Sequence, residues 1–137
     1  NQTPVELEIS MELGSEAPGY NNNWPSDISF FFNNIHVANW TSPGDFGTQR
    51  GKFTPKWWYN NINQYGLLKV LRINKEGTYI DGEKVSEVTL DQLNINQKQW
   101  TFRIAVLPDT THVGGVTLYG AGFGNYDQDI IVKLYYT

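Results

Sequence analysis

Apolar and polar side chains alternate near the start of this chain, and the same period recurs in short segments along most of its length. Val5, Leu7, Ile9, Met11 and Leu13 are separated by three glutamates and a serine. This pattern predicts a strand with one buried face and one acidic, solvent-exposed face. Helical spacing is limited to single turns near residues 55–59 and 90–93. The chain is therefore constrained to an all-β fold.

Two pairs of turn-forming residues predict β-hairpins. Asn33-Asn34 separates apolar runs at 28–32 and 35–40, and asparagine tolerates the positive φ of a tight turn. Asp81-Gly82 lies between runs at 77–80 and 84–90 and is the strongest short hairpin signal in the sequence.

Further strands are expected at 67–74, 100–106, 113–119 and 129–136. The alternation assigns Trp100 to the core and places Ile130, Val132, Leu134 and Tyr136 on a single face. About eight or nine short strands predict a jelly-roll-like antiparallel β-sandwich. Because 137 residues suffice for one hydrophobic core, we expect residues 1–137 to form a single domain.

Composition narrows the classes of function. The chain has no cysteine, so disulfides, thiolate nucleophiles and Cys-ligated zinc are excluded. A net charge of -4 without a basic cluster argues against direct contact with DNA. No apolar run approaches the roughly 20 residues of a membrane span. We expect a cytoplasmic protein without a metal or cofactor and without a membrane partner.

The segment from Trp40 to Leu68 has neither strand nor helix periodicity, although it is rich in tryptophan, glycine and short polar residues. Long irregular segments in small domains usually build a binding surface. Aromatic faces beside polar side chains suit a flat, polyhydroxylated ligand. We therefore expect a ligand-binding domain for a small polar molecule such as a sugar.

Candidate ligand-binding residues lie in this segment and in the other turns. Aromatic candidates would stack on the ligand, and polar candidates would supply hydrogen bonds. In each case a structural role in a turn or in the core is the alternative. The candidates are Trp24, Asp27, Asp45, Arg50, Trp57, Trp58, Gln64, Tyr65, His112, Asn125 and Asp127.

The sequence gives little support for an enzyme. No pattern pairs carboxylates for glycoside hydrolysis, no serine lies in a nucleophile elbow, and His36 and His112 are too scattered for a metal site. The glycines at 120, 122 and 124 resemble a dinucleotide-binding loop only superficially, since a strand follows them and not a helix. Asp127 and Asp129 alone are too few for calcium.

Several unusual segments occur in one order: WPSDI, WTSPGDFGTQRG, TPKWW, QYGLLK, GTYIDGEKVS, HVGG and GFGNYDQDI. In these, the chain resembles the C-terminal β-rich domain of bacterial ArsR-like winged-helix transcriptional regulators, from about Glu6 to Tyr135. The resemblance implies an effector-sensing or interaction domain, excised from a longer regulator whose winged helix binds DNA. It implies no ligand, and metal sensing does not carry over because the required cysteines are missing.

Two other functions remain open. A carbohydrate-binding module, free-standing or attached to an enzyme, is favoured by the aromatic and asparagine content alone. A structural dimerisation domain would instead bury the tryptophans between two copies, so a homodimer is a possible partner arrangement.

Overall fold

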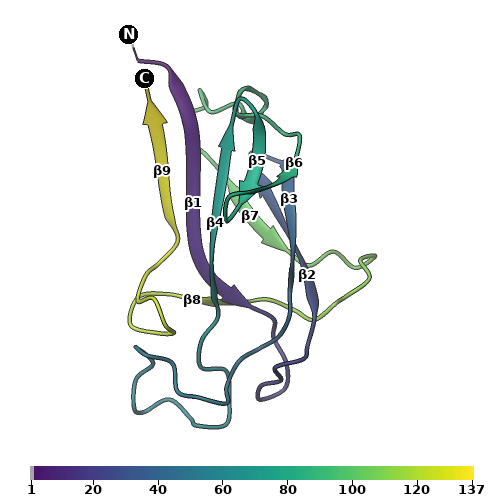
Figure 1. The fold of residues 1–137 in the computed structure, drawn as a ribbon, viewed down its shortest axis with the longest axis vertical. Helices are drawn as coiled ribbons and strands as arrows, with labels where there is room; N and C mark the ends of the chain where they lie inside the picture. The colour runs from purple at the N-terminus through teal and green to yellow at the C-terminus, as the bar shows by residue number, and fades with distance from the viewer. Residues whose placement is uncertain (1) are drawn as a thin grey trace.

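The computed structural model describes residues 2–137 as two antiparallel β-sheets packed face to face, which confirms the all-β sandwich (Figure 1). The elements are β1 (Pro4–Gly14), β2 (Ser26–Phe32), β3 (Ile35–Ser42), β4 (Leu67–Asn74), β5 (Gly77–Ile80), β6 (Glu83–Ser86), the 3-10 helix η1 (Leu90–Leu93), β7 (Phe102–Ala105), β8 (Thr117–Tyr119) and β9 (Ile131–Tyr136). Within residues 2–137, helical structure long and apolar enough to cross a membrane does not occur.

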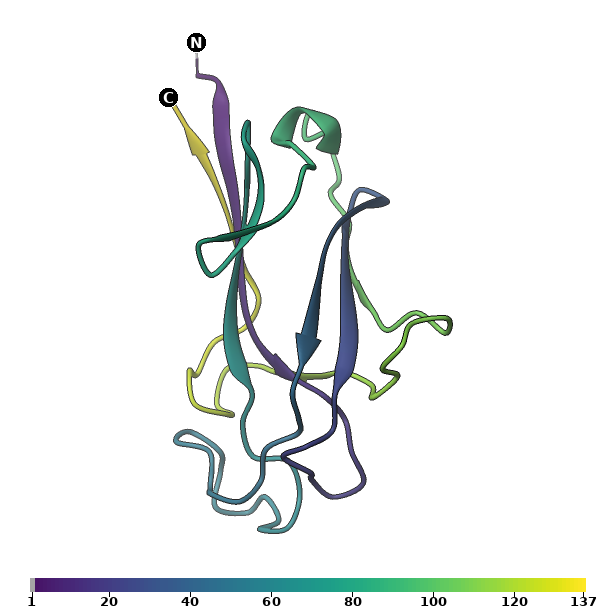
Figure 2. The ribbon, with the colours of Figure 1, turned by 45° about the vertical axis from the view of Figure 1, so that its right-hand side comes forward.

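The larger sheet has six strands in the order β6-β5-β4-β1, with both β8 and β9 paired to the far edge of β1. The smaller sheet has the order β3-β2-β7. Figure 2 shows the two sheets as separate layers, with η1 at the end near the termini and long loops at the other end. We call that other end the loop end; it contains residues 15–25, 43–66 and 120–130.

The core lies between the sheets, as the alternation in β1 predicts. Leu7, Ile9, Met11 and Leu13 are all buried. They pack against Phe30 and the other inward residues of the smaller sheet in one hydrophobic cluster. A single core shared by both sheets makes the sandwich one packing unit.

Both predicted hairpins form. Asn33 and Asn34 adopt φ of 47° and 68°, and Asp81 and Gly82 adopt φ of 52° and 85°. The strand after Asp81-Gly82 ends at Ser86, earlier than predicted, because the chain turns into η1 at Leu90. The isolated turn expected near residue 90 is thus confirmed as a 3-10 helix.

The core assignment of Trp100 is wrong, and one face of β9 is more exposed than the inner face of β1. Trp100 is 37% exposed, and it precedes β7 and covers Phe32 from outside with a ring-centroid distance of 5.7 Å. Val132 and Tyr136 are on the predicted face, but they are 43% and 49% exposed. The smaller sheet has only three strands, so it covers β1 and β4 and leaves the edge strand β9 half uncovered.

Candidate functional site

A buried glutamate holds the loop end together. Glu12 is 1% exposed, although the alternation in β1 assigns it to the solvent face. Its Oε2 accepts hydrogen bonds from the backbone N–H groups of Gly66 and Asn125, both at 2.9 Å, and its Oε1 accepts one from Tyr126 at 3.1 Å. Glu12 therefore ties the segments 43–66 and 120–130 to the end of β1.

The two loops also bind each other directly. Phe53 N donates to Gly124 O at 2.7 Å, and Gly124 N donates to Thr54 Oγ1 at 3.0 Å. The side chain of Asn125, a predicted ligand-binding residue, accepts a hydrogen bond from Lys52 N at 2.8 Å. Asn125 thus joins the loops, and its amide oxygen is engaged by the backbone.

Arg50 organises the tip of the long loop. Its guanidinium donates to Pro55 O at 2.7 Å, to Trp58 O at 2.8 Å and to the side-chain oxygen of Asn60. Arg50 does not pair with Asp45. Asp45 Oδ2 accepts a hydrogen bond from Ala17 N, and Asp45 Oδ1 has no partner within residues 2–137. Arg50 fixes the backbone that carries the two adjacent tryptophans.

Three aromatic rings from the two loops meet at right angles. Trp58 and Phe123 have centroids 5.4 Å apart and an interplanar angle of 86°. Trp57 lies 5.8 Å from each of them, at 77° to Trp58 and 85° to Phe123. Trp57 is 70% exposed, whereas Trp58 is partly buried and donates its indole N–H to Asn63 O at 2.8 Å. Edge-to-face contacts of this kind stabilise the group.

A small hollow of about 270 Å³ opens beside this group. It is lined by Trp58, Asn63, Thr117, Leu118, Tyr119, Gly120 and Phe123. Trp58 is therefore the one predicted tryptophan that lines this hollow. Drug-sized ligand pockets usually measure about 300–1,000 Å³, so this hollow fits a small molecule or a head group.

Tyr119 lines the hollow, and buried Asp45 lies close enough to Tyr119 to affect its hydroxyl. Tyr119 is 7% exposed, and its enclosed hydroxyl makes no hydrogen bond of good geometry among residues 2–137, although the side chain of Asn63 lies beside it. Burial raises the pKa of this hydroxyl most, and the carboxylate of Asp45 raises it further. The side chain of Asn63 lowers this pKa, and Glu12 adds a smaller increase. Asp45 Oδ2 accepts a bond from Ala17 N at 2.9 Å, but its buried Oδ1 is unpartnered within the same residues. Burial also raises the pKa of Asp45.

Gln64 and Tyr65 make contacts within the loop end, whereas the buried indole N–H of Trp24 has no partner within residues 2–137. Gln64 is buried, its amide donates to Tyr59 O at 2.6 Å, and its oxygen accepts from Gly51 N at 3.2 Å. Tyr65 stacks on Phe46 at 5.5 Å. Trp24 lies in the 15–25 loop, where its backbone N–H donates to Pro43 O at 2.9 Å. None of the three lines the hollow.

Asp27 and His112 form a separate pair away from the hollow. The carboxylate of Asp27 accepts hydrogen bonds from Thr110 Oγ1, His112 N and Thr41 Oγ1 at 2.7–2.9 Å, and it contacts His112 Nδ1 at 3.2 Å. The Thr110 hydroxyl holds the pKa of Asp27 well below its ordinary value, and the His112 N–H and the Thr41 hydroxyl lower it further. Asp27 thus pins the 106–116 segment to β2 and β3.

Asp127 closes its own loop. Its Oδ1 accepts a hydrogen bond from Gly122 N at 2.6 Å, and Asp129 Oδ1 accepts one from Ala121 N at 2.9 Å. These two carboxylates cap the turn that presents Phe123. No group of three acidic or histidine side chains in residues 2–137 is arranged to hold a metal ion.

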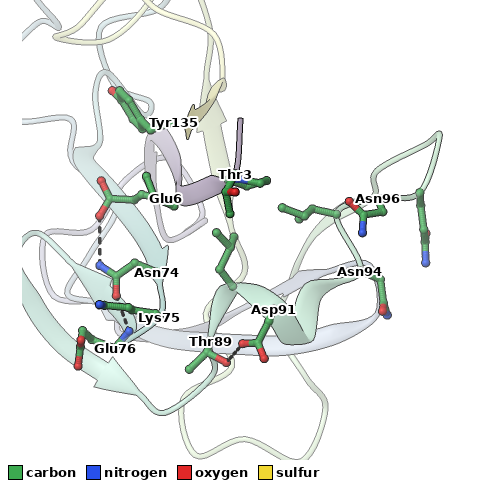
Figure 3. A pocket seen from close by; sticks show the side chains of 15 residues that line it. Thr3, Glu6, Asn74, Lys75, Glu76, Thr89, Asp91, Asn94, Asn96 and Tyr135 are labelled. Carbon is green, nitrogen blue, oxygen red and sulfur yellow. Dashed lines mark hydrogen bonds between the residues drawn. The ribbon is translucent and has the colours of Figure 1, made fainter. Parts of the chain in front are cut away.

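A larger groove lies at the opposite end, near the termini. Its volume is about 1420 Å³, and Figure 3 shows its polar lining, with Glu6 and Tyr135 on one side and Asn94 and Asn96 on the other. None of the predicted site residues line it. Its rim side chains bond to one another, as Asn74 does to Glu6 at 3.2 Å. The smaller hollow has the stronger claim as a site because paired aromatic rings from two loops line its wall.

Sequence reasoning missed every residue that lines the hollow except Trp58, and it also missed the role of Glu12. Phe123 and Tyr119 lie in or beside the glycine-rich turn, and Asn63 lies in the predicted irregular segment, so their types and positions were available signals. The burial of Glu12 could not be predicted. The alternation in β1 places Glu12 on the solvent face of the sheet, and a loop far away in the sequence covers it.

Comparisons with known proteins add no identification. No protein-family model, no curated protein and no solved structure matches the chain.

Proposed function

We propose that this chain is a non-catalytic binding domain for a small polar molecule and that the hollow beside Trp58 is its site. The observation that carries the proposal is the pair of perpendicular rings, Trp58 and Phe123, at the wall of a hollow that Tyr119 and Asn63 also line. Rigid aromatic walls with few polar groups are typical of small-molecule sites.

The loop contacts support a site that is formed before the ligand arrives. Arg50 fixes the backbone of Trp58, and Glu12 joins the loop of Trp58 to the loop of Phe123. A site that is already ordered loses less conformational entropy on binding.

The biological role that we propose is effector sensing in a cytoplasmic bacterial transcriptional regulator. This role depends on the resemblance to ArsR-like regulators, and DNA contact would belong to a separate winged-helix domain. A ligand acts as an effector only if its affinity differs between two arrangements of the regulator.

A carbohydrate-binding module is the second candidate. It is favoured by Trp57 and Tyr59, which are 70% and 75% exposed on one loop, because exposed rings stack on sugars. A winged helix encoded in the same reading frame would favour the regulator, whereas a signal peptide or catalytic domain would favour the module.

Thermal shift and tryptophan fluorescence against a panel of sugars, amines and carboxylates test the proposal. A ligand at 100 times its dissociation constant stabilises the fold by about 2.7 kcal/mol. Binding should be lost in Trp58→Ala and kept in Trp100→Phe, which alters a ring at the other end of the sandwich. Sedimentation of Trp57→Ala tests the dimerisation alternative, since an interface built on that exposed ring would dissociate.

A further inference from the structure

Two buried carboxylates, those of Glu12 and Asp45, lie near the hollow. Glu12 and Tyr119 are opposite each other in the β1–β8 pair, so their side chains lie on the same face of the sheet. Asp45, also buried, is close enough for its carboxylate to influence the Tyr119 hydroxyl. Glu12 and Asp45 are therefore two buried carboxylates close to Tyr119, one of the residues that line the hollow.

Within the described part of the chain, residues 2–137, these two carboxylates have no cationic partner. Neither Glu12 nor Asp45 takes part in a salt bridge within residues 2–137. The nearest basic residues in sequence belong to the long loop and are directed elsewhere. Arg50 donates to loop carbonyls, and Lys52 Nζ lies 5.6 Å from the ring of Phe53.

The walls add to the same electrostatic preference. The faces of aromatic rings carry negative partial charge, and a cation within about 6 Å of a ring centroid is attracted to it. Trp58 and Phe123 provide two such rings at 86° to each other. Leu118 and Thr117 complete an apolar surround that suits methyl groups.

We infer that the hollow selects a small cationic head group, an alkylammonium of about the size of choline, over neutral or anionic molecules. The inference rests on the proposed function, because it specifies the ligand of the same site. Aromatic faces attract the ammonium, and the buried carboxylates of Glu12 and Asp45 add long-range attraction. The negative charge of the two buried carboxylates would repel an anionic ligand.

Choline and 3,3-dimethyl-1-butanol, its uncharged carbon isostere, form a matched pair of probes. Each is titrated by NMR at constant ionic strength, with glucose and acetate as further probes. Choline should shift the amide signals of residues 117–123 and bind at least about tenfold more tightly than the isostere. Asp45→Asn should weaken choline binding several-fold and leave the isostere unaffected, while Asp109→Asn, an exposed control, should change neither.

The outcomes separate this inference from the proposed function. Equal binding of choline and its isostere, or binding of glucose or acetate alone at the same amides, overturns the cationic preference and leaves the site in place. Absence of binding by every probe, including the wider panel, overturns both. If Asp45→Asn fails to fold, Phe123→Leu gives the second reading, since loss of an aromatic face should weaken choline binding more than isostere binding.

Discussion

Glu12 accepts a hydrogen bond from the backbone N–H of Asn125 at 2.9 Å, across 113 residues of chain. The same oxygen accepts one from Gly66, so a single buried carboxylate connects the first strand to both loops of the site. A buried acceptor with several backbone donors is costly to replace because each donor would lose its partner.

Replacement of Glu12 by glutamine should destabilise the domain by about 1–3 kcal/mol, because an amide NH₂ would face backbone donors. Urea unfolding measures the change. Glu83→Gln, at an exposed position of β6, is the matched control and should stay within about 0.5 kcal/mol of the wild type. An equal, small effect of both substitutions would contradict the role assigned to Glu12.

Gly124 and Gly122 permit a paired test of loop packing. Both have positive φ, 70° and 83°, so alanine strains the backbone at each. A Cβ at Gly124 would lie 2.2 Å from Glu12 Oε2, whereas a Cβ at Gly122 would meet nothing within 4 Å. Gly124→Ala should therefore lower the melting temperature by several degrees more than Gly122→Ala. Identical melting temperatures would show that Gly124 does not pack on Glu12.

Asp27 should make stability fall in acid. Its folded-state pKa is depressed below the ordinary value of 3.8, so its contribution is fully present above that pH and is lost as the pH falls below it. The stability difference between wild type and Asp27→Asn should be constant near neutral pH and shrink in this acidic range. Denaturant unfolding at a series of pH values checks this, and a difference that grows in acid would refute it.

Arg50→Lys should loosen the long loop without unfolding the sandwich. Lysine cannot reproduce the three acceptor contacts of the planar guanidinium. Limited digestion with trypsin should cut faster at Lys52 and Lys56 than in the wild type, while the urea midpoint changes little. Arg103→Lys, on the exposed face of β7, serves as the control. Unchanged cleavage at both lysines would argue against the clamp.

Local chemistry made the strands and hairpins predictable. Asn33-Asn34 and Asp81-Gly82 determine their turns through their own φ preferences, and the inner face of β1 follows from the period of two. Alternation predicts which face of a strand Trp100 shares with its apolar neighbours. It does not predict whether other residues cover that face, and Trp100 is partly exposed. Tyr136 shows the same limit, since only the sheet assembly reveals that β9 extends beyond its partner sheet.

The site was predictable in part. Aromatic residues in an irregular segment favour a binding surface, which predicts Trp57 and Trp58 as ligand-binding residues. Trp58 does line a hollow. The polar candidates were harder to assign. Arg50, Gln64, Asn125 and Asp127 bond to nearby backbone, since turns and loops must satisfy their own amides and carbonyls. The types of these residues do not show whether their side chains bond to the backbone of the loop or to a ligand.

The most direct test of the hollow as a ligand site is an NMR titration of the whole chain with a set of small amines, sugars and carboxylates. We predict that at least one compound shifts the indole N–H signal of Trp58 together with the amides of residues 117–123. Shifts confined to residues 89–97, which line the groove at the other end, or no shifts with any compound, would contradict the account.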